Sequence, residues 1–241
     1  MIYFISDVHL GFDKGESDKA RENLLIEFLD KIESSCEKLF IVGDLFDYWF
    51  EYSSVIPRNY IRTLSKLLAL SQSGIPIEYL IGNHDFGHVD FFEKELGIPV
   101  FGDDIEREIK GKKFYISHGD GKSNNDIGYR ILKKILRNKY CQRLYRLLHP
   151  DWGIALASNS SRKSRHYTGK KDFGLSEGMS EFAKSKIDAG FDFVIMGHRH
   201  RAEVIDFSNG KYINLGDWLG PATYAVFDGN DVHLKKVDGC C

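Results

Sequence analysis

Ile81-Gly82-Asn83-His84-Asp85 is the stretch of sequence that decides the fold. An apolar run from Ile77 ends here in a glycine, and an amide, an imidazole and a carboxylate follow in consecutive positions. In open α/β sheets, ligands bind beyond the carboxyl ends of the strands. Taken alone, Gly-Asn is also ordinary turn chemistry. The interpretation therefore depends on whether other strands of the chain end in the same way.

Four other apolar runs also end in Asp or His. Together with the first run they present these polar side chains: Asp7 and His9, Asp44, Asn83 and His84, His118, and His198 and His200. Residues two apart in a strand point to the same face. The spacing of Asp7 with His9, and of His198 with His200, therefore predicts two ligands on one side of each strand end.

Carboxylate, imidazole and amide oxygen together suit a divalent transition metal. Seven of these side chains, all except His84, are candidate ligands. Seven exceed one four-coordinate site and suit two ions that share a bridging carboxylate, with Asp44 as the natural bridge. Any one of these residues by itself would be an ordinary strand-end or surface residue, but five coinciding strand ends favour a metal centre. No cysteine lies beside a histidine in the chain, which disfavours nucleophilic catalysis by a thiol.

The residues that follow Asn83 are candidates for proton transfer at such a centre. His84 would protonate a leaving group or stabilise charge in the transition state. Asp85 would orient His84, cap the start of the next helix, or do both. A dinuclear centre of this kind predicts hydrolysis of a phosphate ester by an activated water.

The order of elements predicts a single α/β domain over residues 1–241. Amphipathic helices are expected at Lys19 to Glu33, Arg58 to Ser73, Val89 to Leu96 and Ser176 to Asp188, and three strands after residue 200. Two layers of mixed sheet with helices outside account for this order. Residues 122–175 would form a helical cap inserted over one edge of the sheets.

The cap differs from the rest of the chain in charge. Gly128 to Lys171 holds twelve basic residues and one acidic residue, although the net charge of the 241-residue chain is −2. This asymmetry indicates an anionic partner. Within it, Tyr129 to Leu148 is an amphipathic helix, or two helices that break near Asn138.

Two interpretations of the basic insertion remain open. In one, it is a lid packed on the body with a solvated basic face. In the other, its leucines and tyrosines line an acyl groove and its Lys and Arg side chains meet diphosphate or anionic lipid. Nucleic acid is disfavoured because no binding motif accompanies the patch. The sequence does not predict an oligomeric state.

The remaining features concern location. The four cysteines form no C-x-x-C pair, which favours a reducing compartment. No signal peptide and no apolar run long enough to cross a bilayer is visible. We therefore expect a cytoplasmic protein, or one peripheral on a cytoplasmic membrane face.

Together the motifs resemble the calcineurin-like metallophosphoesterase superfamily. Its D-x-H, G-D, G-N-H-D, H and G-H-x-H elements occur here in order. The resemblance implies a four-layer α/β/β/α sandwich with a helical cap and a dinuclear centre. One ion would bind Asp7, His9, Asp44 and His200, and the other would bind Asp44, Asn83, His118 and His198.

Three further segments are similar to the UDP-2,3-diacylglucosamine pyrophosphohydrolases of lipid A biosynthesis. They are Gly43 to Trp49, His118-Gly119-Asp120 with Asp126 to Tyr129, and Leu215 to Trp218. This resemblance implies cleavage at the α-phosphate to give UMP and 2,3-diacylglucosamine 1-phosphate, with manganese. The ligand set also accepts iron or zinc. Implied substrate contacts are Asn83, His84, Asp126, Ser160, Ser164 and His198.

Two alternatives remain beside the lipid nucleotide. Many members of the narrower family carry arginine where this chain has His84, so a general phosphatase or phosphodiesterase acting on soluble nucleotides or phosphoproteins is the second hypothesis. The third is an inactive scaffold on the same fold. A missing metal ligand would mark such a scaffold, and none is missing here.

Overall fold

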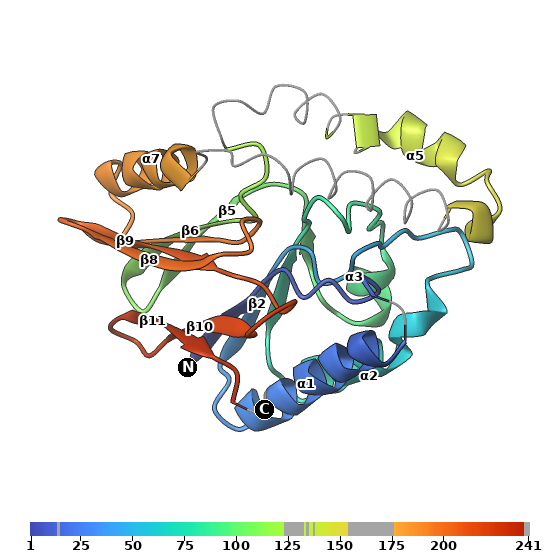
Figure 1. Ribbon diagram of the computed structural model, residues 1–241, viewed down its shortest axis with the longest axis horizontal. Coiled ribbons are helices and arrows are strands. Elements are labelled where there is room, and N and C mark those ends of the chain that lie inside the picture. The colour runs from blue at the N-terminus through green and yellow to red at the C-terminus, as the bar shows by residue number, and fades with distance from the viewer. Residues whose placement is uncertain (14, 123–132, 134, 137, 154–175, 239–241) are drawn as a thin grey trace.

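Two β-sheets stack face to face, with helices on both outer sides (Figure 1). The computed structural model describes residues 1–13, 15–122, 133, 135–136, 138–153 and 176–238. Helices α1 (Glu16–Glu33) and α2 (Ile61–Gln72) cover one sheet, and α7 (Ser176–Asp188) covers the other. The predicted α/β/β/α sandwich is confirmed.

The first sheet is mostly parallel. Its strands are β1 (Ile2–Ile5), β2 (Lys38–Val42), β3 (Ile77–Leu80), β4 (Val100–Phe101), β10 (Thr223–Phe227) and β11 (Val232–Lys236). They lie in the order β11-β10-β1-β2-β3-β4, and β10 and β11 run antiparallel to their neighbours. The parallel core means that β1, β2 and β3 all end at the same edge.

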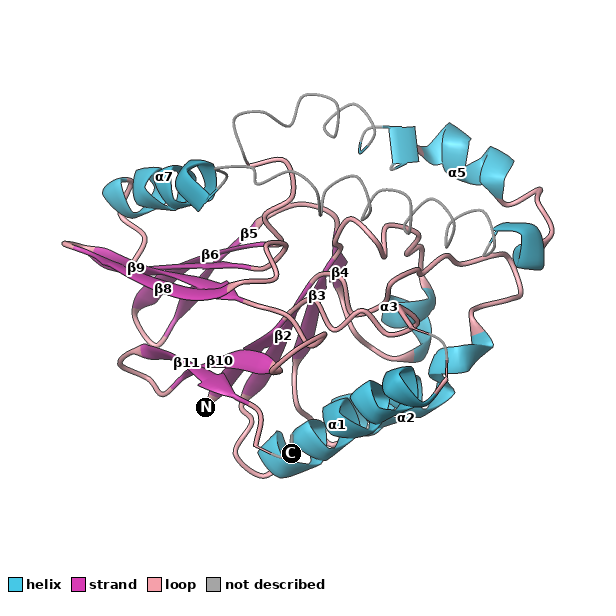
Figure 2. Cartoon of the chain, in the orientation of Figure 1, coloured by secondary structure: helices cyan, strands magenta, loops and turns pink. Residues whose placement is uncertain are grey.

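The second sheet has the same character. Its strands are β5 (Ile105–Ile109), β6 (Lys112–Ser117), β7 (Phe193–Met196), β8 (Ala202–Phe207) and β9 (Gly210–Leu215). They lie in the order β5-β6-β7-β9-β8, with β6, β7 and β9 parallel. β6 and β7 therefore also end side by side. They belong to the sheet whose strands β5, β6, β8 and β9 are labelled in Figure 2.

Strand alternation divides the buried residues into three layers. In β1, Tyr3 and Ile5 pack against the helices, whereas Ile2 and Phe4 pack between the two sheets. Residues on alternate positions point to opposite faces, so a strand that is apolar at every position can be buried on both sides. The third layer lies between the second sheet and α7, where Met179, Ala183 and Ile187 are spaced four residues apart.

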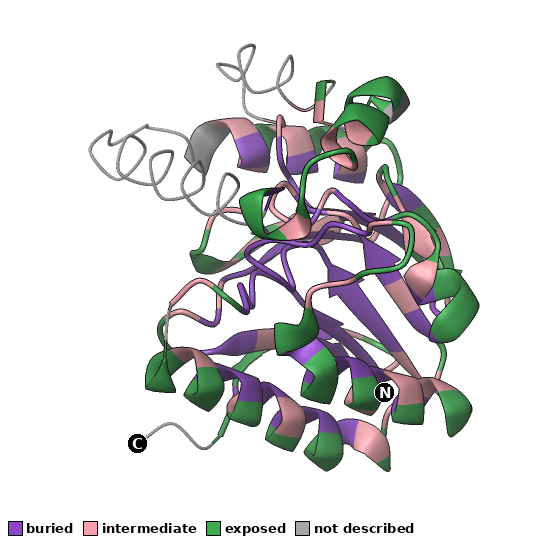
Figure 3. Ribbon diagram, turned by 90° about the vertical axis from the view of Figure 1, so that its right-hand side faces the viewer, coloured by how far each residue is buried: buried purple, intermediate pink, exposed green. Residues whose placement is uncertain are grey.

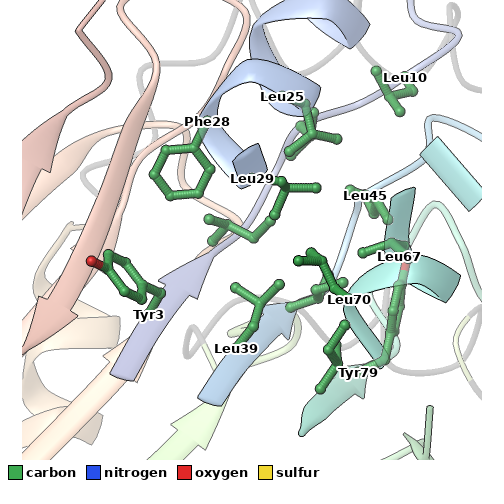
Figure 4. Packing of buried hydrophobic residues seen from close by; sticks show 14 of the residues in the cluster. Tyr3, Leu10, Leu25, Phe28, Leu29, Leu39, Leu45, Leu67, Leu70 and Tyr79 are labelled. Carbon is green, nitrogen blue, oxygen red and sulfur yellow. The ribbon is translucent and has the colours of Figure 1, made fainter. Parts of the chain in front are cut away.

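The helices of the first sheet bury one face each. Leu25, Phe28 and Leu29 of α1 point toward Tyr3 and Leu39 of the sheet (Figure 4). The opposite faces of α1 and α2 are exposed (Figure 3). This arrangement confirms the apolar stripe that the sequence predicted for α1.

Several boundaries differ from the sequence prediction. α1 begins at Glu16, about one turn before the predicted Lys19. A short 3-10 turn, η1 (Arg58–Tyr60), precedes α2, and α3 is limited to Phe91–Glu95. Gly74, just beyond α2, has φ of +91°, a conformation that favours glycine and ends the helix where predicted.

The prediction of three C-terminal strands is wrong, because the structure has four. Tight turns join β8 to β9 and β10 to β11. Between them, residues 216–222 carry the chain from the second sheet to the first. Apolar alternation reports burial and does not report which sheet a strand joins, so this crossing was not visible in the sequence.

The described part of the cap contains α5 (Lys139–Tyr145). The side chain of Asn138 accepts hydrogen bonds from Tyr140 N at 2.8 Å and Cys141 N at 3.3 Å, as an N-cap does. This N-cap favours the alternative of two helices that break near Asn138 over a single helix. Most of the predicted insertion, 123–132 and 154–175, lies outside the described residues, so its limits stay a prediction. Within the described ranges, no helix combines the length and apolar character that a membrane span requires.

Phe4 provides a test of the layer between the sheets. Its side chain is fully buried and stacks on Phe40 at 5.0 Å and on Phe114 at 5.9 Å, which joins both sheets. We expect Phe4→Ala to lower the free energy of unfolding by about 3–5 kcal/mol, measured by urea denaturation. Val204→Ala, at a position that is 41% exposed on β8, is the control and should change stability by less than about 1 kcal/mol. Equal effects of both substitutions would contradict this assignment of the core.

Candidate metal centre

All seven predicted metal ligands lie at one edge of the sandwich, in the loops that follow β1, β2, β3, β6 and β7. The two sheets bring together residues that are far apart in the chain, such as Asp7 and His198, which are separated by 191 positions. Asp7, His9, Asp44 and His118 are buried, whereas Asn83 and His198 are intermediate and His200 is exposed. The site is therefore buried around Asp7, His9, Asp44 and His118 and open to solvent at His200; this open side is called the mouth of the centre.

The backbone at this edge adopts an unusual conformation. Five of the seven ligands have positive φ: Asp7, His9, Asp44, His198 and His200, with values from 51° to 71°. Side-chain-bearing residues rarely occupy this left-handed region, and such strain concentrates at functional sites. The left-handed turns interrupt the strand alternation on which the sequence prediction of paired ligands relied. The pairs nevertheless converge, because the turns fold each strand end back over the site.

Two glycines allow the loops to approach each other. A Cβ atom at Gly82 would collide with the carboxylate of Asp44. A Cβ atom at Gly197 would collide with Ser6 and with Asp7. Each glycine directly precedes a ligand, so the glycines of the motifs are explained by the close packing of the ligand loops.

One group of ligands surrounds Asp7. Its Oδ1 lies 3.6 Å from His9 Nε2 and 3.5 Å from His200 Nε2. The two imidazole nitrogens are 3.2 Å apart. Asp44 Oδ2 lies 3.8 Å from His9 Nε2 and so borders this group.

A second group lies on the other side of Asp44. Asp44 Oδ2 is 3.3 Å from His118 Nε2. Asn83 Oδ1 lies 3.0 Å from His118 Nε2 and 2.8 Å from His198 Nδ1. Asp44 thus stands between two sets of nitrogen and oxygen atoms, in the place that a bridging carboxylate would occupy.

The donor atoms of the site fit divalent ions. Asp7 Oδ1 and Asp44 Oδ2 are buried and have no hydrogen-bond partner among the described residues. Buried carboxylate oxygens are normally hydrogen-bonded, so a cation would satisfy both atoms. Three overlapping groups can each place a ligand atom within 4.8 Å of the others: Asp7, His9 and His200; His9, Asp44 and His84; Asp7, Asp44 and His118.

Partners behind the histidines fix which nitrogen faces the centre. His118 Nδ1 lies 2.9 Å from the Val42 carbonyl oxygen, and His200 Nδ1 lies 3.1 Å from Asp217 Oδ2. A proton held on Nδ1 leaves Nε2 as the metal-binding nitrogen. Asp217 was not singled out from the sequence as a site residue. Its only signal there is its position in the Leu215 to Trp218 segment, directly after an apolar run.

Asp47 is the second residue that sequence reasoning missed. His84 Nδ1 lies 3.2 Å from the Asp47 carbonyl oxygen and 3.3 Å from Asp47 Oδ1. The same carboxylate oxygen is 3.6 Å from His9 Nδ1. One carboxylate therefore stands behind both a predicted ligand and the predicted proton donor. It follows the second strand by only a few residues, like the ligands themselves.

Asp85 has a different place from the one expected. Its buried carboxylate accepts hydrogen bonds from Gly82 N at 2.7 Å, from Leu45 N at 3.0 Å and from the Tyr79 hydroxyl. These contacts tie the Gly82–Asp85 turn to the loop of Asp44, whereas the carboxylate beside His84 is that of Asp47. Asp85 also does not cap a helix, because α3 begins at Phe91. We therefore reassign Asp85 from orienting His84 to holding the two loops together.

The electrostatics of the centre reflect its buried negative charge. Burial lowers the pKa of His118, but the nearby negative charge of Asp44, whose Oδ2 lies 3.3 Å from His118 Nε2, raises this pKa to about 10. Burial also lowers the pKa of His9, and the carboxylates of Asp47 and Asp7 raise it to about 10. The carboxylates thus hold protons on these histidines when no other cation is bound.

The predicted substrate contacts divide into two sets. Asn83, His84 and His198 lie in the loops at the mouth of the centre. Asn83 Oδ1 is 3.0 Å from His118 Nε2 and 2.8 Å from His198 Nδ1, and His84 follows Asn83 in the same loop. Asp126, Ser160 and Ser164 lie outside the described residues.

Comparison with known proteins follows this geometry. The family model described as calcineurin-like phosphoesterase matches residues 1–202. The chain is 35% identical to the UDP-2,3-diacylglucosamine hydrolase of Porphyromonas gingivalis, covering 98% of this chain and 97% of that protein. It is 27% identical to the enzyme of the same name from Aeromonas salmonicida, over 97% and 92% of the two chains. For that of Haemophilus influenzae the identity is 29%, over 90% of each chain.

Asp44 provides the test of the bridging position. We expect Asp44→Ala to remove both ions together, because its carboxylate borders both ligand groups. Metal content of the dialysed protein, measured by plasma mass spectrometry, should fall from up to two ions per chain toward none. Asp228→Ala, an exposed carboxylate in the β10–β11 turn, is the control and should keep the full metal content. Loss of only one ion from the Asp44 variant would contradict the bridge.

Proton release provides an independent test. Ligand histidines must be neutral, so metal binding near pH 7 should displace protons from His9 and His118, whose pKa values are raised to about 10. Metal affinity should then rise with pH below about 10, by about tenfold per pH unit for each displaced proton. Calorimetric titration in buffers of different ionisation enthalpy counts these protons. Heats that do not depend on the buffer would refute the assignment, and the exposed His233→Asn variant should match the unmodified protein.

Proposed function

The chain belongs to the calcineurin-like phosphoesterase family, and from this membership we propose that it hydrolyses the pyrophosphate of UDP-2,3-diacylglucosamine. Attack at the α-phosphate would give UMP and 2,3-diacylglucosamine 1-phosphate. The observation that carries the proposal is the 35% identity over 98% of the chain to a hydrolase named for this substrate. The family implies divalent metal ions, and the ligand groups described above are suited to them.

The metal ligands would act in two sets. Asp7, His9, Asp44 and His200 would hold one ion, and Asp44, Asn83, His118 and His198 would hold the other. When bound, two divalent ions supply positive charge to the phosphate and activate water for attack on phosphorus. We propose manganese as the ion in use, with iron and zinc as the other metals that this ligand set accepts.

His84 would serve the leaving group. Asp47 holds its Nδ1 through both a carbonyl oxygen at 3.2 Å and a carboxylate oxygen at 3.3 Å. The ring stands 4.8 Å from the ring of the ligand His9, at an interplanar angle of 90°. With Nδ1 held by Asp47, Nε2 is the nitrogen that would donate a proton to the departing oxygen or stabilise its charge.

Several substrate contacts come from the resemblance to this enzyme family. Asn83, His84 and His198 would contact the diphosphate at the mouth of the centre. Asp126, Ser160 and Ser164 are proposed as contacts to the rest of the substrate.

The cap would meet the membrane in which a diacyl substrate resides. Leu144, Leu147 and Trp152 are 67%, 82% and 72% exposed, and Arg143 lies in the same helix as Leu144. Exposed leucine and tryptophan beside basic residues are typical of segments that lie in a membrane interface. We propose that the protein works as a peripheral protein at the cytoplasmic face of the inner membrane.

The activity itself is tested by comparing substrates. We expect UMP release from UDP-2,3-diacylglucosamine with manganese. His84→Ala should reduce kcat by about 10²- to 10⁴-fold, the contribution of a general acid. His233→Ala, at an exposed position on β11, is the matched control and should keep the rate. No UMP release beside rapid hydrolysis of soluble nucleotides or simple phosphodiesters would replace the proposal by the general phosphodiesterase alternative.

Membrane contact is tested separately. Leu147→Asp should weaken co-sedimentation with vesicles of phosphatidylethanolamine and phosphatidylglycerol, because it puts a charge into the apolar surface. Ile61→Asp, at a position that is 63% exposed at the start of α2, is the control and should bind as the unmodified protein does. Equal binding of all three proteins would contradict a membrane contact through the cap.

A further inference from the structure

Helix α5 rests on two segments that flank the metal centre. Arg146 Nε donates to the Glu51 carbonyl oxygen at 3.2 Å, in the segment that follows Asp44. Gln142 Nε2 donates to the Phe86 carbonyl oxygen at 3.4 Å, just after His84. Figure 1 shows α5 and the turn after it lying above the loop that follows β2. The inner side of the cap is thereby fastened to the loops that carry the site.

Tyr145 is the centre of this attachment. Its hydroxyl accepts a hydrogen bond from the Tyr48 hydroxyl at 3.3 Å and donates one to the Gly153 carbonyl oxygen at 2.6 Å. Its ring packs on Phe50 at a centroid distance of 4.6 Å. One side chain therefore joins α5, the helical turn at 150–153 and the body of the protein.

Gly153 confirms how close this contact is. A Cβ atom at this position would lie 3.3 Å from both the Cε1 and the hydroxyl oxygen of Tyr145, and would collide with the Tyr52 hydroxyl. Because it presents a glycine there, the turn approaches the two tyrosines without this clash.

The segment that contacts α5, residues 48–51, is held in place by hydrogen bonds to residues 87–91. Glu51 N donates to the Gly87 carbonyl oxygen at 3.0 Å, and Gly87 N donates to the Trp49 carbonyl oxygen at 3.1 Å. The buried Glu51 carboxylate accepts hydrogen bonds from Val89 N and Phe91 N at 2.9 and 3.1 Å. The neighbour of Tyr48 in this segment is Asp47, which holds His84. Tyr145 therefore attaches the cap to the same fixed segment that positions the catalytic imidazole.

We propose that Tyr145 is a positioning residue that sets the placement of α5 relative to His84. A substrate that extends from the metal centre to the cap must contact both at once, so its affinity depends on that placement. A small phosphodiester occupies only the metal centre and is independent of it. The inference rests on the proposed function, because it assumes a substrate whose acyl groups extend beyond the diphosphate.

Removal of one hydroxyl at a time tests the proposal. Tyr145→Phe and Tyr48→Phe keep both rings and should raise the KM for UDP-2,3-diacylglucosamine about five- to tenfold, with kcat changed less than twofold. Because they break a shared hydrogen bond, the double variant should be no worse than Tyr145→Phe alone. Tyr140→Phe, on the same helix and 74% exposed, is the matched control with an unchanged KM. Hydrolysis of bis(p-nitrophenyl) phosphate should stay within twofold in every variant.

Other kinetic outcomes overturn the proposal. An unchanged KM in Tyr145→Phe would show that α5 is placed without this hydroxyl. A loss of kcat, or of bis(p-nitrophenyl) phosphate hydrolysis, would show that Tyr145 acts on the metal site and not on the cap.

A readout without substrate separates this inference from the proposed function. Amide hydrogen exchange over residues 138–153 should be faster in Tyr145→Phe than in the unmodified protein and in Tyr140→Phe. If the unmodified protein releases no UMP but exchange behaves as expected, the proposed substrate fails and the attachment stands. If UMP is released but exchange and KM are unchanged, the attachment fails and the proposed function stands.

Discussion

The structure depends on two carboxylates, Asp7 and Asp44, that are buried at the ends of adjacent parallel strands. Each leaves one buried oxygen without a hydrogen-bond partner among the described residues. A buried carboxylate without compensation is costly, and the surrounding histidines provide that compensation only by taking up protons. Divalent ions would compensate this charge more completely. The buried negative charge of Asp7 and Asp44 is therefore itself suited to binding cations.

The rest of the fold holds these buried carboxylates in position. Two sheets, covered by helices on both outer faces, hold five strand ends at fixed positions along one edge. Left-handed backbone at Asp7, His9, Asp44, His198 and His200 then turns the ligands over the site. Such strained positions persist only where the surrounding core fixes them. The three apolar layers are therefore as important to the site as the ligands.

Carboxylates that contact the outer nitrogens of the histidines orient the imidazole rings toward the centre. Asp217 holds His200, and Asp47 stands behind both His9 and His84. The Asp85 carboxylate joins the loops of Asp44 and Asn83 by accepting hydrogen bonds from the backbone N–H groups of Leu45 and Gly82. The same Asp47 segment receives α5 through Tyr48 and Tyr145, so the loop that follows the second strand connects the chemistry of the site to the placement of the cap.

The sequence by itself determined the helices and most of the strands, because apolar periodicity follows directly from burial. It also singled out the seven candidate ligands, because five apolar runs end in the same kind of polar side chain, and the structure brings these seven residues to one edge of the sandwich. Only the tertiary structure decided which strands share a sheet, as the fourth C-terminal strand shows. It also decided that the carboxylate in contact with the His84 ring is that of Asp47 and not that of Asp85. Adjacency in the chain does not specify adjacency across two loops, since hydrogen bonds between loops depend on how the strands that carry them are packed.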